Sequence, residues 1–425
     1  MLTILVWNIE MYGAKFTGNT PVDNLCRMIR DQMIAVIMAK SEAQVVMVQE
    51  VRENGIVRLP VVTNLLNSLD QTDWHFDVVK GAVSTGDYPT FDDLFFSQNA
   101  NNEGYAVFWR GNAVTLQTTA QSQSYGMDAT DHSTTADHVI GLVNEGYRFN
   151  WVPDGNQMGI AFKGTDTAPD KGLIGFPYSN IPNIVGDDEK DANILSRVNT
   201  RRPVMVTVTC NEISFPVVAY HAPVHLNSSI AGTIATMAAG DLCSRTVTGA
   251  YNTNAVRVFA GDLNLKTFAN GLSAAGMATT AGLTRTMIQN DGDSPATMVR
   301  PIDYFNAEYN DDSYLYTARD FAFGSEVVNS VGIYDPVGVL YADRTLAEIL
   351  TSNEGIMDLL FDERSYIAHL PLPNQELEGG EWPDVLAQYL GVLDGTVSET
   401  DQINICSVFY RIFVSDHIPV QITLT

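Results

Sequence analysis

Short apolar runs recur along the chain and predict β-strands. They are rich in Val and Ile, and Gly, Pro, Asn or Asp residues bound them, which is the pattern of strands. The runs lie at residues 2–7, 44–50, 105–109, 203–208, 215–221, 256–262 and 418–424. Several are apolar on both faces, as expected for strands that are buried between layers.

Two longer segments predict helices between these strands. Residues 23–42 carry apolar side chains at helical spacing, and residues 228–247 form a helix-like stretch between two strands. Strands that alternate with helices indicate a layered α/β or α+β sandwich. Residues 111–200, rich in Asn, Asp, Gly, Thr and Pro, and residues 306–405, which mix acidic turns with short helix-like pieces, resemble insertions.

The charge of the chain limits its possible partners. The 425 residues include 24 Lys and Arg against 50 Asp and Glu, a formal net charge of -26, and 45% are apolar. This length suits one large globular domain with insertions. Such an acidic chain repels nucleic acid unless its few basic residues are concentrated in one place, which excludes a basic protein that coats DNA. A metal-dependent enzyme with a local basic rim stays possible.

The sequence favours a cytoplasmic or virion-associated location over secretion. No run approaches eighteen apolar residues, so no membrane span is expected. The first residues show neither a basic segment nor a small-residue cleavage site, so no signal peptide is expected. Cys26, Cys210, Cys243 and Cys406 are far apart and form no CxxC motif, which fits a reducing compartment.

Polar side chains stand repeatedly at the ends of the predicted strands, where α/β proteins commonly build sites. They are Asn8, Glu50, His221, Asp262, Asn264, Asp416 and His417. The carboxylates are hard oxygen ligands that suit Mg²⁺ or Mn²⁺. The histidines supply a donor and an acid or base near neutral pH. This set of side chains fits hydrolysis of a phosphoester.

Eight motifs follow one another in the order seen in a known family. They are WNIEMYG (7–13), VVMVQEVRENG (45–55), EGYAVFWR (103–110), RRPVMV (201–206), VVAYHAP (217–223), AGDLN (260–264), RPIDYF (300–305) and SDHIPVQITLT (415–425). In this order they resemble the endonuclease/exonuclease/phosphatase superfamily, and within it deoxyribonuclease I. The resemblance implies an α+β fold, a four-layer α/β/β/α sandwich, made by a single catalytic domain over residues 1–425.

The resemblance also implies a metal site and a catalytic pair. Glu50 would be the main ligand of Mg²⁺ or Mn²⁺, with Asn8 and Asp416 beside it. His221 and His417 would lie on either side of the scissile phosphate.

Further residues would support that pair. Glu103 would orient His221 and Asp303 would orient His417, because a carboxylate on the far nitrogen of an imidazole fixes its tautomer. Asp262 would align the attacking water or share the metal. Asn264 would hold a phosphate oxygen.

Two arginines match residues that contact the DNA backbone in the deoxyribonuclease branch. They are Arg52 and Arg201, and a DNA substrate is therefore expected. The segments that match residues 111–200 and 306–405 are short in the family, so these insertions could narrow the substrate groove or bind a protein partner.

Three functions stay open on the sequence. The first is a DNA endonuclease that uses in-line attack by water. The second is a phosphatase or phosphodiesterase that acts on a lipid head group, an inositol phosphate or another small phosphoester, since a fold does not fix its substrate. The third is a virion or partner-binding module that retains the fold.

Overall fold

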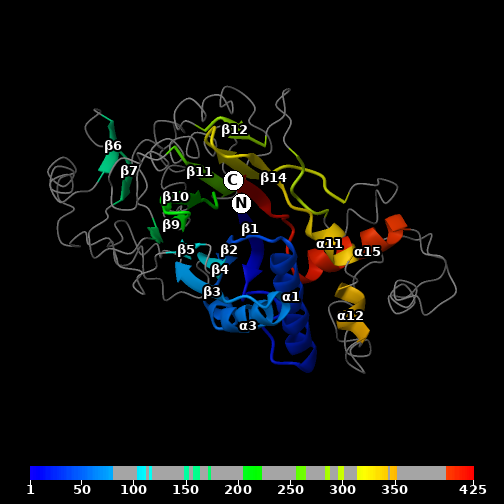
Figure 1. Cartoon of the computed structure of the whole chain (residues 1–425). Helices are drawn as coiled ribbons and strands as arrows, with labels where there is room; N and C mark the ends of the chain where they lie inside the picture. The colour runs from blue at the N-terminus through cyan, green and yellow to red at the C-terminus, as the bar shows by residue number, and fades with distance from the viewer. Residues whose placement is uncertain are drawn as a thin grey trace, which may run out of the picture.

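A computed structural model gives the structure of the protein (Figure 1). The residues that it describes are 1–79, 103–111, 114–116, 148–152, 157–162, 171–173, 204–222, 255–264, 283–287, 295–300, 314–342, 345–351 and 399–425. They form two β-sheets and a layer of helices, which agrees with the predicted α+β class. No helix among them is long and apolar enough to cross a membrane.

The first sheet, sheet A, is a mixed sheet of six strands in the order β14-β15-β1-β2-β4-β3. These strands are β14 (Ser330–Ile333), β15 (Val420–Leu424), β1 (Leu2–Tyr12), β2 (Val45–Val51), β4 (Gly104–Arg110) and β3 (Trp74–Val79). The central strand β1 runs parallel to β2 and antiparallel to β15. Segments far apart in sequence are therefore neighbours in the middle of this sheet.

The second sheet, sheet B, has seven strands. Six lie in the order β12-β13-β11-β10-β9-β5, and β8 also pairs with β9. These strands are β12 (Arg285–Thr286), β13 (Asp320–Gly324), β11 (Val258–Asp262), β10 (Ile213–Ala219), β9 (Val204–Cys210), β5 (Thr115–Leu116) and β8 (Lys171–Leu173). Strands β6 (Arg148–Val152) and β7 (Gln157–Phe162) form a separate hairpin.

Both faces of sheet A are buried, because alternate side chains of each strand enter different cores. On β1, Ile4 and Val6 pack with sheet B, against residues such as Val217 and Ala260. Leu5 and Trp7 point to the opposite face and pack with the helices. This explains why β1 is apolar on both faces in the sequence.

The helices cover the outer face of sheet A (Figure 1). They are α1 (Pro21–Lys40), α3 (Leu59–Asp70), α11 (Pro336–Ala342), α12 (Thr345–Thr351) and α15 (Glu399–Phe413), with the short α2 (Glu53–Ile56) before α3. A capping box starts α1, in which Thr20 and Asp23 satisfy each other's backbone amides. The described layers are thus helices, sheet A and sheet B. The helix predicted at 228–247, on which a fourth layer depends, lies outside the described residues.

Part of the range 306–405, for which an insertion was predicted, belongs to the two sheets. Strands β13 and β14 lie within that range and belong to the two sheets. Helix α11 of the same range also contributes to the core on sheet A through Val337 and Leu340. The acidic and turn-rich composition of the range hid these short elements. Similarly, β5 and β8 of the predicted insertion 111–200 extend sheet B.

Gly261 on β11 lies in close contact with Tyr220 and with Gln49 of β2. Its φ is +141°, and a Cβ on it would lie 2.2 Å from the carbonyl oxygen of Tyr220 and 2.4 Å from Nε2 of Gln49. The backbone NH of the next residue, Asp262, donates to Oε1 of Gln49 across the sheets at 3.1 Å. A side chain at position 261 would therefore push sheet B away from β2.

We expect Gly261→Ala to lower the free energy of unfolding by about 2–4 kcal/mol, since it adds a strained φ to an overpacked contact. Urea denaturation measures this change. The matched control is Gly332→Ala on β14, where a Cβ meets no atom within 4 Å and the change should stay within about 0.5 kcal/mol. Equal midpoints for the two variants would contradict the close approach.

Candidate active site

Side chains from both sheets meet at one end of the sandwich. Asn8 and Glu50 come from β1 and β2 of sheet A, and Asp262 ends β11 of sheet B. His221 follows β10, and His417 precedes β15. The structure thus brings together five residues that were predicted from separate motifs.

Asn8 joins the two sheets at this site. Its Nδ2 donates to Oε1 of Glu50 at 3.0 Å and to Oδ2 of Asp262 at 3.2 Å. The other carboxylate oxygen of Glu50 accepts from the backbone NH of Met11 at 2.8 Å. Asn8 is fully buried, so its amide is held in place and keeps the two carboxylates apart.

His221 has a carboxylate next to Nδ1, the ring nitrogen that points away from Asp262. Its Nδ1 lies 3.0 Å from Oε2 of Glu103, while its Nε2 lies 3.4 Å from Oε1 of Glu50 and 3.5 Å from Oδ2 of Asp262. Arg52 in turn donates to Oε1 of Glu103 at 2.8 Å. The structure therefore shows Arg52 as the anchor of the carboxylate behind His221, while its contact with DNA stays a prediction.

His417 has the same arrangement, but with a partner that the sequence analysis did not identify. Its Nδ1 lies 2.8 Å from Oδ2 of Asp320, the first residue of β13. The resemblance implies this role for Asp303, which lies outside the described residues. Asp320 opens the run Asp-Phe-Ala-Phe, which is a short strand signal with an acid at its start. That signal could have identified it.

Asp262 lies between the two imidazoles. Its Oδ2 is 3.5 Å from Nε2 of His221 and 3.6 Å from Nε2 of His417. Each imidazole thus turns Nδ1 to an outer carboxylate and Nε2 to the same central oxygen. This arrangement aims two potential proton donors at one point.

Asn264 is held next to Asp262 rather than turned outward. Its backbone NH donates to Oδ1 of Asp262 at 2.8 Å, and its Nδ2 donates to the carbonyl of Ala222 at 2.7 Å. Its Oδ1 accepts from Nη1 of Arg319 at 2.9 Å. Arg319 was missed in the sequence, although it directly precedes the equally missed Asp320.

Asp416 joins the cluster through His417 and Glu10. Its Oδ1 lies 3.5 Å from Nε2 of His417, and its backbone NH donates to Oε2 of Glu10 at 3.1 Å. The same Glu10 oxygen accepts from Arg411 at 2.7 Å and from Lys15 at 2.5 Å. Glu10 therefore fixes the loop before β15, a role that the sequence did not suggest.

Several residues of the cluster have strained backbones. Glu10, Glu50 and Asn264 have φ values of +48°, +63° and +51°, in the left-handed region that non-glycine residues seldom adopt. Each costs on the order of 1–2 kcal/mol. Strain of this kind is typical of functional sites, where the surrounding structure holds a side chain in a required place.

The local charges favour a protonated His417. Burial alone would lower the pKa of its imidazole, but Asp320, Asp416 and Asp262 outweigh burial and raise that pKa well above its usual range. Burial would raise the pKa of Asp416, yet His417 and Arg411 hold it below its usual value. At neutral pH the cluster therefore holds an imidazolium among carboxylates.

The cluster has the ligands for a divalent cation. Glu50, Glu103 and His221 form one group with ligand atoms within 4.8 Å of one another, and Asp262, Asp320 and His417 form a second. Oδ1 of Asp416 is buried and makes no hydrogen bond among the described residues. Carboxylate oxygens crowded in this way repel one another, and a hard cation such as Mg²⁺ or Mn²⁺ would relieve that repulsion.

Comparisons with known proteins gave a result only among solved structures. No protein-family model matches the chain, and no curated protein matches it. The mannosyl-6-phosphatase of Bacteroides thetaiotaomicron VPI-5482 is similar at 12% identity and a TM-score of 0.42, over 100% of each chain.

Two other solved structures are also similar to this chain. An endonuclease/exonuclease/phosphatase family protein from Leptotrichia buccalis has 13% identity and a TM-score of 0.40, with 100% of each chain covered. TDP2 from D. rerio, complexed with a single-strand DNA product, has 12% identity and a TM-score of 0.36, over 79% of this chain and 88% of that one. The chemistry of the site therefore follows from its own side chains.

We expect millimolar Mg²⁺ or Mn²⁺ to raise the melting temperature of the metal-free protein, because a bound cation stabilises the folded state by about 2.7 kcal/mol at one hundred times its Kd. Glu50→Gln should abolish most of this shift. Glu326→Gln, at an exposed position outside the cluster, is the matched control and should keep it. A full shift in Glu50→Gln would remove Glu50 as a ligand.

We expect Asp320→Asn to lower the pKa of His417, because the variant loses the carboxylate that stabilises the imidazolium. NMR titration of the imidazole protons in metal-free protein measures it, with His417→Gln to assign the signal. Asp303→Asn is the comparison and should leave the pKa unchanged. A lower pKa of His417 in Asp303→Asn, with no change in Asp320→Asn, would assign the orienting role to Asp303.

Proposed function

We propose that this chain is a divalent-metal-dependent phosphoester hydrolase that cleaves DNA endonucleolytically. The observation that carries the proposal is the placement of Asp262 between two imidazoles, each backed by its own carboxylate. This arrangement suits a tetrahedral phosphoryl group, whose oxygens accept from the histidines while a carboxylate aligns water.

Glu50, with Asn8 and Asp416, would hold Mg²⁺ or Mn²⁺. The cation would neutralise charge on the phosphoryl group. Such a cation would be required, because the three carboxylates would otherwise repel an approaching phosphate. The side chains of Glu50 and Asp416 are 13% and 24% exposed, against 2% for Asp262, so substrate would reach the cluster from the side of the metal ligands.

His417 would donate a proton from Nε2, because its raised pKa keeps both ring nitrogens protonated at neutral pH. Nδ1 remains bonded to Asp320 and fixes the ring. His221, fixed in the same way by Glu103, would hold a second phosphoryl oxygen. A single proton donor of this kind contributes about 100- to 10 000-fold to a rate.

Asp262 would align the attacking water and accept its proton. Asn264 would keep that carboxylate in place through its backbone NH. Its Nδ2 already donates to Ala222 and Asp262, so it would hold a phosphate oxygen only in exchange for its contact with Asp262. In-line attack then requires the leaving oxygen to lie opposite the water, on the side of one imidazole. The chain would supply positions and protons, and the attack would occur in one step without a covalent intermediate.

DNA is the proposed substrate because the QEVR segment and the RRP segment match those of deoxyribonucleases. Arg52 and Arg201 remain proposed contacts with the DNA backbone, although Arg201 lies outside the described residues. A small phosphoester is the second candidate. The net charge of -26 favours it, since a small substrate is less repelled by the whole surface than a polyanion.

Plasmid nicking with Mg²⁺ or Mn²⁺ tests the proposal, with EDTA as the metal-free control. We expect His221→Ala to slow nicking by about 100-fold or more. His75→Ala, at an exposed histidine of β3, should nick at the wild-type rate. Nicking that survives EDTA or His221→Ala would overturn the proposed mechanism.

Absence of nicking would move the test to small substrates. Hydrolysis of sugar phosphates, inositol phosphates or lipid head groups, dependent on both metal and His221, would establish the second candidate. Folded protein that hydrolyses neither DNA nor these esters would refute a hydrolase and leave a binding or assembly role.

A further inference from the structure

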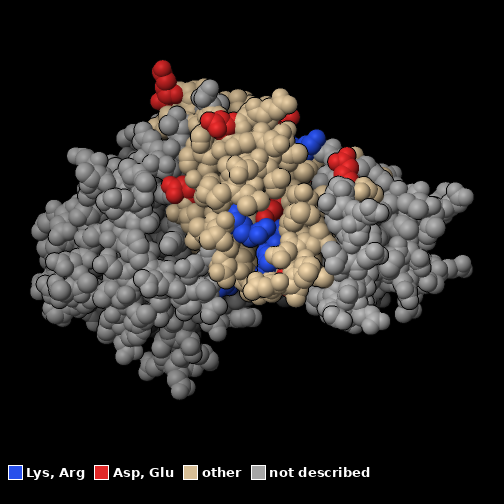
Figure 2. Space-filling model, turned by 90° about the horizontal axis from the view of Figure 1, so that it is seen from below, with Lys and Arg blue, Asp and Glu red and all other residues tan. Residues whose placement is uncertain are grey.

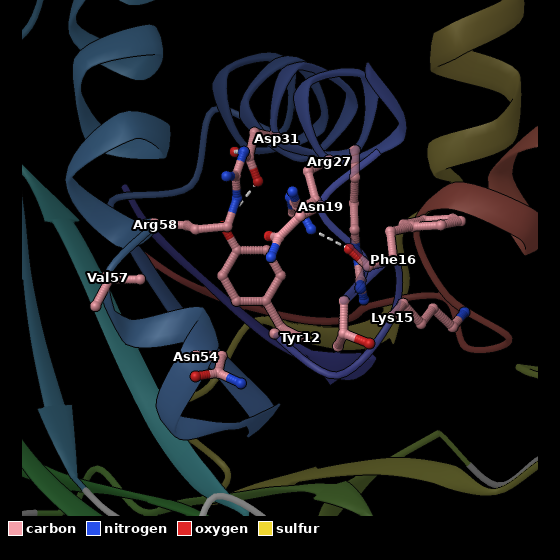
Figure 3. Close-up of a pocket in the computed structure, with 12 residues that line it drawn as sticks. Tyr12, Lys15, Phe16, Asn19, Arg27, Asp31, Asn54, Val57 and Arg58 are labelled. Atoms are coloured by element: carbon pink, nitrogen blue, oxygen red, sulfur yellow. Dashed lines mark hydrogen bonds and ion pairs between the residues drawn. The ribbon is translucent and has the colours of Figure 1, made fainter. Parts of the chain in front are cut away.

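A cavity of about 380 Å³ lies beside the catalytic cluster and contains none of its residues. It lies between the segment after β1, the start of α1 and the short helix α2 (Figure 3). Tyr12, Phe16 and Val57 give it apolar walls, and Arg27, Arg30 and Arg58 give it positive charge. Its volume is within the range of about 300–1,000 Å³ for small-molecule sites.

The charge of this cavity is opposite to that of the chain. Of the 24 Lys and Arg residues in a chain with a net charge of -26, three guanidinium groups line one cavity with the single carboxylate Asp31. Lys15 also lines it, but its side chain extends away from the other labelled residues (Figure 3). Its ammonium donates to Oε2 of Glu10 at 2.5 Å. Figure 2 shows that Lys and Arg side chains gather near the middle of one described face, with acidic side chains mostly around it.

The positive charge is only partly compensated. Asp31 accepts from the hydroxyl of Tyr12 at 2.8 Å and forms an ion pair with Arg58. The hydrogen bonds of Arg27 and Arg30 go to neutral oxygens instead, such as the carbonyl of Gly18 for Arg27 and that of Glu10 for Arg30. Glu10, Asp31 and Glu50 attract Arg30 through space, but Asp31 is the one carboxylate in the lining against three guanidinium groups, so the lining keeps a net positive charge.

Buried donors without a partner point to the same conclusion. Nε of Arg30 and Nε of Arg58 are buried and make no hydrogen bond within the described part of the chain, and Arg30 is 2% exposed. A buried donor left unpaired costs about 1–3 kcal/mol, so an acceptor that reaches it is strongly favoured. Phosphate oxygens suit guanidinium donors in charge and geometry.

We propose that this cavity binds the phosphate of a phosphomonoester, with its organic part against Tyr12, Phe16 and Val57. This is a site apart from the catalytic cluster, and it does not depend on the proposed hydrolysis. The phosphate could belong to a free small molecule, such as a nucleotide, or to the phosphorylated end of a nucleic acid strand. The two sources share the chemistry that the arginines recognise.

Calorimetric titration of metal-free protein with inorganic phosphate and with a nucleoside monophosphate tests the site. EDTA keeps the catalytic cluster without a cation. We expect saturable binding at one site, weakened about five- to tenfold in Val57→Glu, which puts a like charge at the rim. Val57 is 75% exposed, so this change should leave the fold intact.

Two matched variants control for the change of net charge. Val327→Glu, at an exposed position between β13 and β14, should leave the affinity within about twofold. Arg27→Gln should weaken binding, while Arg285→Gln on β12, which removes the same charge elsewhere, should not. Equal effects within either pair, or no saturable binding by wild-type protein, would overturn the site.

The catalytic cluster is the competing location. Phosphate binding that is lost in His417→Gln but unchanged in Val57→Glu would place the anion there and overturn the proposal. An oligonucleotide with a 5′-phosphate, compared with the same strand without it, distinguishes the sources. Tighter binding of the phosphorylated strand than of the mononucleotide supports a strand end, and the opposite order supports a free phosphomonoester in the same cavity.

Discussion

The close approach of the two sheets at one end of the sandwich is the constraint on which the site depends. Gln49 on β2 accepts from the backbone NH of Asp262 on β11, and Asn8 on β1 donates to the carboxylate of the same residue. Polar contacts between sheets are costly unless every group is paired. Here they fix the distance between strands that carry different parts of the site. The requirement for glycine at position 261 follows from this distance.

The second constraint on the site is electrostatic: carboxylates alternate with imidazole and guanidinium groups. Each imidazole lies between an outer carboxylate and Asp262. Arg52 donates to the outer carboxylate Glu103, while Arg319 donates to Asn264 and Arg411 to Glu10. This pairing lets many buried ionisable groups coexist, because each charge has a neighbour of opposite sign. Oδ1 of Asp416, which makes no hydrogen bond among the described residues, remains for the proposed cation.

The sequence predicted much of this arrangement because long strands and strand-end residues leave strong local signals. Strands β1, β2, β10, β11 and β15 were located from apolar runs, and Asn8, Glu50, His221, Asp262 and His417 from their ends. The sequence did not reveal β13, which has five residues like β11 and β15 but lies in a range of acidic turns. The motif at 300–305, with Asp303, received the orienting role instead of Asp320. The contacts of Glu10 and Arg52 depend on tertiary placement, which periodicity does not encode.

The pairing of β1 with β15 has a consequence for how the protein matures in the cell. Residues 2–6 pair with residues 420–424, and His417 lies just before that strand. At about 5–20 residues per second, the ribosome needs on the order of 20–80 seconds to make the chain between them. Throughout that interval the nascent chain presents β1 with an open edge, which is a template for aggregation. Synthesis of the strand that follows His417 also closes this edge, so a chain that stops short of it lacks both His417 and the cover of β1.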